Sequence, residues 1–164
     1  MGVSPRSRLT LQLTHPAISF EGSAYHDTNW GRSSLEESFD YWTWSRAELD
    51  SGTLVIYDLQ ERSGRIHQHA LLYDEAGAIH PIESLAPVSL SKSHWGTRRE
   101  SRADHGSQPS LAHSLIDSPF YTRDLLETQL LNQRTLAMHE ALDLKRFSQP
   151  WVRFLLPFRI RQQR

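Results

Sequence analysis

Cysteine is absent from the sequence, and neither sign of charge dominates it. Without cysteine, the chain has no disulfides and no thiolate metal ligands. Lys and Arg number 18 against 19 Asp and Glu, so no basic excess favours nucleic acid as a partner. No apolar run approaches the roughly 20 residues of a membrane-spanning helix. Glycine-rich phosphate loops and the G-x-S-x-G motif are also missing.

The 164 residues are 38% hydrophobic, which is enough for one folded domain, and their pattern is that of strands. Residues 53–59 (TLVIYDL) and 67–74 (HQHALLYD) flank an RSGR turn and predict a β-hairpin. Residues 135–147 alternate in polarity, although their composition also suits a helix. Residues 150–160 predict a final extended run with a bend or edge at Pro157. We therefore expect an all-β fold, an antiparallel barrel or sandwich.

The stretch AYHDTNWG, residues 24–31, concentrates polar and aromatic side chains. On an extended strand Tyr25, Asp27 and Asn29 would share one face, because successive side chains alternate. Such a face could hold a carboxylic acid, a phenol that hydrogen-bonds it and an amide that positions water. The alternative is structural, since Asp27 followed by Thr28 and Asn29 also fits an Asx turn.

Aromatic side chains follow this stretch closely. Trp30 lies within it, and Trp42 and Trp44 alternate on a predicted strand, so their rings would line one wall. Together with Tyr57 they could stabilise a cation through their π faces. Large aromatic residues on strands are, however, more often part of a core.

Two further patterns leave alternatives open. His67 and His69 form an H-x-H pair that could bind zinc, but no third ligand is evident and an exposed strand face is favoured. Arg46 could pair with Asp58 or lie on the surface. After Asp143 the chain has only basic charges among its aromatic residues, which fits either a membrane surface or a solvated final strand.

Seven segments, in order, together resemble one family, the carotenoid 1,2-hydratases or hydroxyneurosporene synthases. The segments are AYHDTNWG, YWTWSRA, LVIYDLQERSG, SHWGTRRESRADHG, DSPFYTR, HEALDLKRF and PWVRFLLPFR. The resemblance runs from about Phe20 to Arg159 and matches the C-terminal part of these enzymes. It implies a lipocalin-like antiparallel β-barrel of about eight strands, a size that holds one small ligand.

The resemblance also implies a reaction and its residues. The family adds water across the terminal 1,2 double bond of acyclic carotenoids such as neurosporene and lycopene, and the Asp of this motif is its proposed acid. Asp27 is therefore the expected proton donor, assisted by Tyr25. Substrate-binding residues would be Asn29, Trp30, Trp42, Trp44 and Tyr57. Protonation of an alkene requires no metal or other cofactor.

The resemblance further divides the chain into three parts: a poorly matched segment 1–19, a barrel 20–160 and a basic tail 161–164. Family members have an additional N-terminal barrel, which another chain could supply here. Because carotenoids reside in membranes, we expect peripheral association with the cytoplasmic side of a bacterial membrane. The alternative function is a lipocalin-like domain that binds a carotenoid or another isoprenoid without reacting with it.

Overall fold

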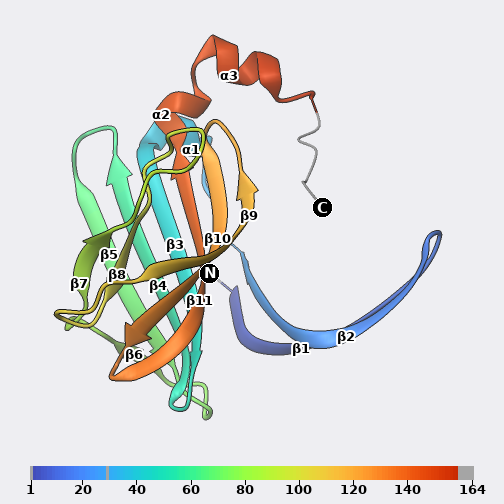
Figure 1. Cartoon of the computed structure of the whole chain (residues 1–164), viewed down its shortest axis with the longest axis vertical. Coiled ribbons are helices and arrows are strands. Elements are labelled where there is room, and N and C mark those ends of the chain that lie inside the picture. Colours follow the sequence, from blue (N-terminus) through green and yellow to red (C-terminus); the bar gives the residue numbers. More distant parts are fainter. Residues whose placement is uncertain (1, 29, 159–164) are drawn as a thin grey trace. The chain divides into compact units, whose positions relative to one another are not determined.

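The computed structural model describes residues 2–28 and 30–158, and it divides into two compact units, residues 1–32 and 33–164 (Figure 1). In chain order the elements are β1 (Gly2–Thr14), β2 (Ala17–Thr28), α1 (Leu35–Ser38), β3 (Phe39–Leu49), β4 (Gly52–Glu61), β5 (Ile66–Tyr73), β6 (Ile79–Pro81), β7 (Ala86–Ser89), β8 (Glu100–Ala103), β9 (Ser110–Asp117), β10 (Tyr121–Leu130), β11 (Gln133–Asp143), α2 (Leu144–Phe147) and α3 (Pro150–Leu155). No helix within the described ranges is long and apolar enough to cross a membrane.

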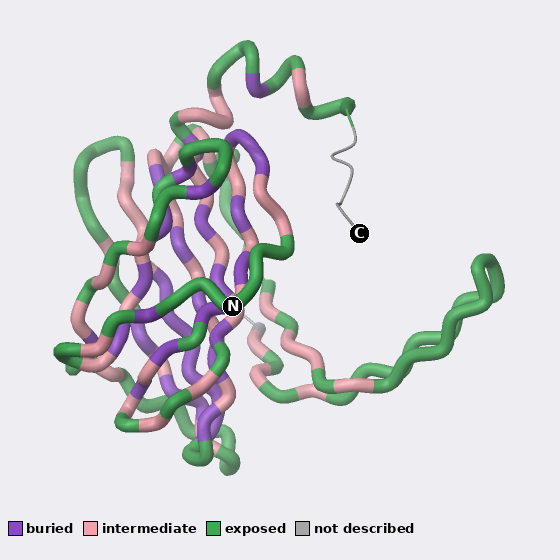
Figure 2. The backbone as a smooth tube through the Cα atoms, in the orientation of Figure 1, coloured by how far each residue is buried: buried purple, intermediate pink, exposed green. Residues whose placement is uncertain are grey.

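The first unit is a long antiparallel hairpin of β1 and β2, which form a sheet of two strands. Its described side chains are exposed or half-buried along its whole length (Figure 2). Five apolar side chains share one face, each between 38% and 49% exposed: Leu9, Leu11, Leu13, Ile18 and Phe20. On the other face Arg8 donates to Glu21 Oε2 at 2.7 Å. The hairpin is thus amphipathic, with an uncovered apolar face.

The second unit is built on one antiparallel sheet of seven strands in the order β6-β5-β4-β3-β11-β10-β9. The expected hairpin of residues 53–59 and 67–74 is confirmed as β4 and β5. The all-β expectation is also confirmed, but the closed barrel of about eight strands is not. Among the described residues the edge strands β6 and β9 do not pair with each other, so the sheet stays open. The pairs β1–β2 and β7–β8 form two separate sheets.

One face of the sheet carries the core, and the two-stranded ribbon β7–β8 lies over it (Figure 1). Burial alternates strictly along β3, where Tyr41, Thr43, Ser45, Ala47 and Leu49 are buried. The apolar cluster lies toward one end of this face and comprises Ala47, Leu49, Leu54, Ile56, Ala70, Leu72, Leu85, Leu130 and Ala137. Apolar packing therefore stabilises one end of the sheet, and the centre is left to polar side chains.

The turn between β10 and β11 has an unusual sequence. Leu131 and Asn132 both have positive φ, 52° and 65°, the conformation of a two-residue hairpin turn that normally selects glycine. The carboxylate of Asp104 accepts the backbone N–H groups of Leu131 at 2.8 Å and of Asn132 at 2.7 Å. A side chain distant in sequence therefore holds this turn.

The C-terminal region corrects two expectations. Of the alternating residues 135–147, residues 135–143 lie in strand β11, but residues 144–147 form the short helix α2. The expected extended run at 150–160 begins as helix α3. Pro150 occupies the start of α3, where its missing N–H costs nothing. Residues 159–160 and the predicted tail 161–164 lie outside the described residues. The segment limits predicted from the resemblance stay predictions.

Candidate functional site

Strand β2 brings Tyr25 and Asp27 together. The Tyr25 hydroxyl donates to Asp27 Oδ2 at 3.0 Å, and both side chains are half-buried. His26, which lies between them, and Thr28, which follows Asp27, are exposed, as strand alternation predicts. The predicted pairing of a phenol with a carboxyl group on one strand face is therefore present. By the same alternation this face is opposite to the apolar face of the hairpin.

Two further residues of the AYHDTNWG stretch, Asn29 and Trp30, were predicted to belong to the site. Trp30 follows β2 and is 80% exposed. Asn29 lies outside the described residues, so its predicted role in positioning water stays a prediction.

Trp42, Trp44 and Tyr57 gather on one face of the second unit. Trp44 is directly opposite Tyr57 on β4, and the ring centroids of Trp42 and Tyr57 are 6.1 Å apart. The shared face of Trp42 and Trp44 is confirmed, but it is the face opposite to the core. Both tryptophans are half-buried, whereas Tyr57 is buried. Tyr25, Asp27 and Trp30 belong to the first unit, whereas Trp42, Trp44 and Tyr57 belong to the second.

The centre of the core face is polar, which the sequence reading missed. His139 is completely buried, and its Nδ1 lies 2.9 Å from Ser45 Oγ, which in turn lies 3.2 Å from Ser101 Oγ. Asp124, directly opposite His139 on β10, is also fully buried and pairs with Arg99. We call these five residues the buried polar cluster. Its sequence signal is polar residues at the buried positions of three alternating strands.

Within this cluster the ion pair of Arg99 and Asp124 is almost fully excluded from solvent. Arg99 Nε lies 2.9 Å from Asp124 Oδ2, with side-chain exposures of 5% and 0%. That contact is poorly directed for a hydrogen bond, while Arg99 Nη2 donates to Asp124 Oδ1 at 3.3 Å. The two charges therefore compensate each other where water cannot.

The buried histidine predicts acid sensitivity. Burial, reinforced by the positive charge of Arg99, lowers the pKa of His139 from 6.5 to about 4. An unfolded chain takes up this proton near pH 6.5 and the folded chain only near pH 4. The stability that neutral His139 provides is therefore complete above pH 6.5 and is lost as the pH falls towards 4.

We expect this loss to be about 3 kcal/mol in the free energy of unfolding between pH 7 and pH 4. Urea unfolding of the wild type and of His139→Gln at both pH values would measure it. The variant, which has no imidazole to protonate, should lose less stability over this range. Equal losses in both proteins would assign the acid sensitivity to other groups.

A second polar pair lines a cavity of about 380 Å³ between β7–β8 and strands β3–β5. Arg102 Nε donates to both carboxylate oxygens of Asp58, at 3.0 and 2.9 Å. Burial raises the pKa of Asp58, and Arg102 opposes that shift. The sequence alternative that paired Arg46 with Asp58 is wrong, because Arg46 bonds Glu48 on the opposite face of the sheet.

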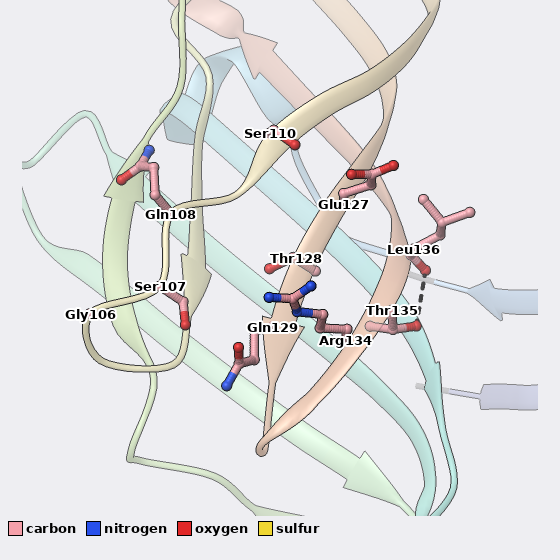
Figure 3. Close-up of a pocket in the computed structure, with 10 residues that line it drawn as sticks. All are labelled: Gly106, Ser107, Gln108, Ser110, Glu127, Thr128, Gln129, Arg134, Thr135 and Leu136. Atoms are coloured by element: carbon pink, nitrogen blue, oxygen red, sulfur yellow. Dashed lines mark hydrogen bonds between the residues drawn. The ribbon is translucent and has the colours of Figure 1, made fainter.

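A larger cavity, of about 630 Å³, lies between the loop before β9 and the β10–β11 hairpin (Figure 3). Glu127, Arg134 and Leu136 line one side of it, with Ser107 and Gln108 on the other. Most of the residues that line it have polar side chains, and none of them is a residue predicted to bind substrate.

The H-x-H pair lies on β5. His67 Nε2 is 2.5 Å from Glu61 Oε1, and His69 is exposed. No group of three His, Asp or Glu side chains placed to hold a metal ion occurs within residues 2–28 and 30–158.

Comparisons with known proteins agree with the resemblance read from the sequence. A family model described as carotenoid hydratase CrtC matches residues 1–164. The chain is 36% identical over 96% of its length to the acyclic carotenoid 1,2-hydratase of Thiocapsa roseopersicina. It is 38% identical over 88% of its length to the enzyme of the same name from Rhodobacter capsulatus. It spans 39% and 52% of the lengths of these two relatives.

The fold has a relative among solved structures. A crystal structure described as AttH from Nitrosomonas europaea superposes with a TM-score of 0.56 at 14% identity, covering 85% of this chain and 50% of that one. This similarity supports a lipocalin-like, β-rich fold. The resemblance to carotenoid hydratases is confirmed by the match over the whole sequence, and the chain belongs to the CrtC carotenoid hydratase family.

Proposed function

We propose that the chain carries the proton-donating part of a hydro-lyase that adds water to the terminal 1,2 double bond of an acyclic carotenoid, neurosporene or lycopene. Its relatives are acyclic carotenoid 1,2-hydratases, and the chain spans about half of their length or less. The observation that carries the proposal is the 3.0 Å hydrogen bond from the Tyr25 hydroxyl to Asp27 Oδ2. It supplies a donor to a carboxyl group at the position where the family resemblance expects an acid.

In the proposed reaction Asp27 is the general acid. Its O–H bond breaks as a C–H bond forms at C2 of the alkene, which leaves a tertiary cation at C1. Water attacks C1, and the proton that it loses returns to the Asp27 carboxylate. Between these steps the Tyr25 hydroxyl stabilises the carboxylate, because a hydrogen bond to a charged acceptor is stronger than one to a neutral acceptor.

Electron-rich side chains complete the proposal. As the resemblance implies, we propose Trp30, Trp42, Trp44 and Tyr57 as substrate-binding residues. An aromatic ring stabilises a nearby cation through its π face by about 2 kcal/mol when water is excluded. Asn29 positions the attacking water. The reaction exchanges only protons and water, so the proposal includes no cofactor.

The partners are proposed on the same basis. The apolar face of the β1–β2 hairpin is formed by five side chains that are 38–49% exposed. Contiguous exposed apolar surface of this kind is typical of an interaction site. We propose that a further domain, of the kind that makes up the remaining length of the relatives, covers this face, on the same or on another chain. Because the proposed substrate resides in a membrane, we propose that the protein associates with the cytoplasmic surface of a bacterial membrane.

The test is an assay of this chain in liposomes loaded with lycopene or neurosporene. A product heavier by one water, identified by chromatography and mass spectrometry, would support the proposal. Stoichiometric binding of pigment by the folded chain, without product, would replace it by the alternative of a non-enzymatic carotenoid or isoprenoid binder.

Replacement of Tyr25 by Phe should slow the reaction without weakening substrate binding. The variant loses a hydrogen bond to a carboxylate, which corresponds to a decrease in kcat of about 10- to 100-fold. Steady-state kinetics should show kcat reduced and KM unchanged. His26→Ala, an exposed neighbour on the other strand face, is the matched control. An equal decrease in both variants would indicate damage to the strand.

A further inference from the structure

The last helices leave a group of large apolar side chains in solvent. Leu144 and Val152 are buried and attach residues 144–158, the C-terminal aromatic segment, to the end of the sheet (Figure 1). Four of its other side chains remain strongly exposed: Trp151 at 46%, Phe154 at 71%, Leu156 at 49% and Phe158 at 61%. The rings of Phe154 and Phe158 lie 5.7 Å apart. The segment therefore has a fixed inner side and an apolar outer side.

A neighbouring loop adds to this apolar surface. Trp95 is 44% exposed, and its carbonyl oxygen accepts a hydrogen bond from Arg146 at 3.0 Å. The Arg146 guanidinium also lies 5.7 Å from the ring centroid of Trp151. Tryptophan and arginine thus alternate across the surface, an arrangement that suits the boundary between lipid headgroups and acyl chains.

The charged side chains of the segment itself are all basic. After Asp143 the sequence has six basic residues and no acidic one: Lys145, Arg146, Arg153, Arg159, Arg161 and Arg164. Arg153 makes one weak ion pair across to Glu36 of α1, at 3.6 Å, and both side chains keep some exposure. Within residues 144–158 the charged side chains are Lys145, Arg146 and Arg153, so the net charge of the segment itself is positive and complementary to an anionic surface.

We propose that the C-terminal aromatic segment is the surface by which this chain docks on anionic lipid membranes. Phe154, Phe158 and Trp151 enter the headgroup region, and the basic side chains remain at the phosphate level. The charge pattern favours lipid over a second copy of this chain, because the same segment of that copy would present the same positive charge. The inference rests on the proposed function only for its reason to expect a membrane.

The test uses vesicles that contain no carotenoid, so its outcome is independent of hydration. The full chain should sediment with phosphatidylcholine vesicles that contain phosphatidylglycerol, much less with pure phosphatidylcholine, and less as salt is added. The double variant Phe154→Ala/Phe158→Ala should weaken this binding at least about tenfold, because it removes apolar area that the membrane buries on binding. Both side chains lie outside the core, so circular dichroism should remain that of the wild type.

The matched control is Ile79→Ala/Leu136→Ala. It removes two other apolar side chains that are more than half exposed, 55% and 56%, from other parts of the same unit. This control should bind within about twofold of the wild type, and so should Asp27→Asn, which separates docking from catalysis. Equal binding by the Phe154→Ala/Phe158→Ala variant, or no binding by the wild type, would overturn the proposal. A chain that instead dimerises without vesicles, and does so less after the two Phe replacements, would assign the segment to a protein interface and overturn it too.

Discussion

Asp27→Asn should reduce carotenoid hydration by about a thousandfold, the largest effect that we expect from any single substitution. General acid catalysis contributes about 10²- to 10⁴-fold, and an isolated alkene is so weak a base that water cannot replace the acid. The carboxamide has nearly the shape of the carboxyl group and can still accept the Tyr25 hydrogen bond. The variant therefore removes the proton and keeps the geometry.

The measurement is the rate of product formation in lycopene-loaded liposomes, with pigment binding recorded alongside. Glu21→Gln is the matched control, since it neutralises another carboxylate of the same strand, one whose side chain is 55% exposed. Asp27→Asn should still bind pigment like the wild type. Hydration by this variant at the wild-type rate would place the proton donor on a different residue and would end the proposed mechanism.

Asp124→Ala should lower the free energy of unfolding by about 3–5 kcal/mol, the largest effect on stability that we expect. The substitution leaves the Arg99 guanidinium, whose side chain is 5% exposed, without its counter-charge in the middle of the core. A buried charge without a partner is among the most costly defects in a folded protein. Urea unfolding followed by far-UV circular dichroism would measure the difference.

The double variant Arg99→Met/Asp124→Leu should recover most of this stability, because it removes both charges and fills the space with apolar side chains. For comparison, Arg123→Ala breaks a partly exposed pair with Glu140 and should cost about 1 kcal/mol or less. If Asp124→Ala were as mild as Arg123→Ala, or if the double variant were as unstable as the single one, the pair would not compensate charge as described.

Local sequence patterns predicted the elements in which neighbouring residues determine the structure. Two β-rich runs around RSGR predicted the β4–β5 hairpin. Alternation favoured a strand at β11, although the composition left a helix open. The same alternation placed Tyr25 with Asp27, and Trp42 with Trp44. It did not reveal which face of β3 is the core face, because Thr43 and Ser45 are buried there whereas both tryptophans are on the outer face.

Features that depend on distant residues were not predictable from local patterns. The five members of the buried polar cluster come from four parts of the chain between residues 45 and 139. The register of the large sheet aligns Ser45, Asp124 and His139, and the packing of the β7–β8 ribbon over that sheet adds Arg99 and Ser101. The turn at Leu131 lacks the glycine that would have predicted it from the sequence. The Asp104 carboxylate accepts the backbone N–H of Leu131 and holds the turn instead. The start of α3 was misread because its composition also fits a strand.

The exposed hairpin has a consequence for how this chain must be handled. Both of its strands are edge strands, and residues 9–20 contain no Lys, Arg, Asp or Glu. Long uncharged edges accept further strands from other molecules through their free backbone groups, and charged residues normally prevent this. Pro5 lies at the other end of β1 and gives this part no protection. In concentrated solution, strand addition between copies would therefore begin at residues 9–20, and a charged residue introduced there would act as a gatekeeper against fibrous aggregation.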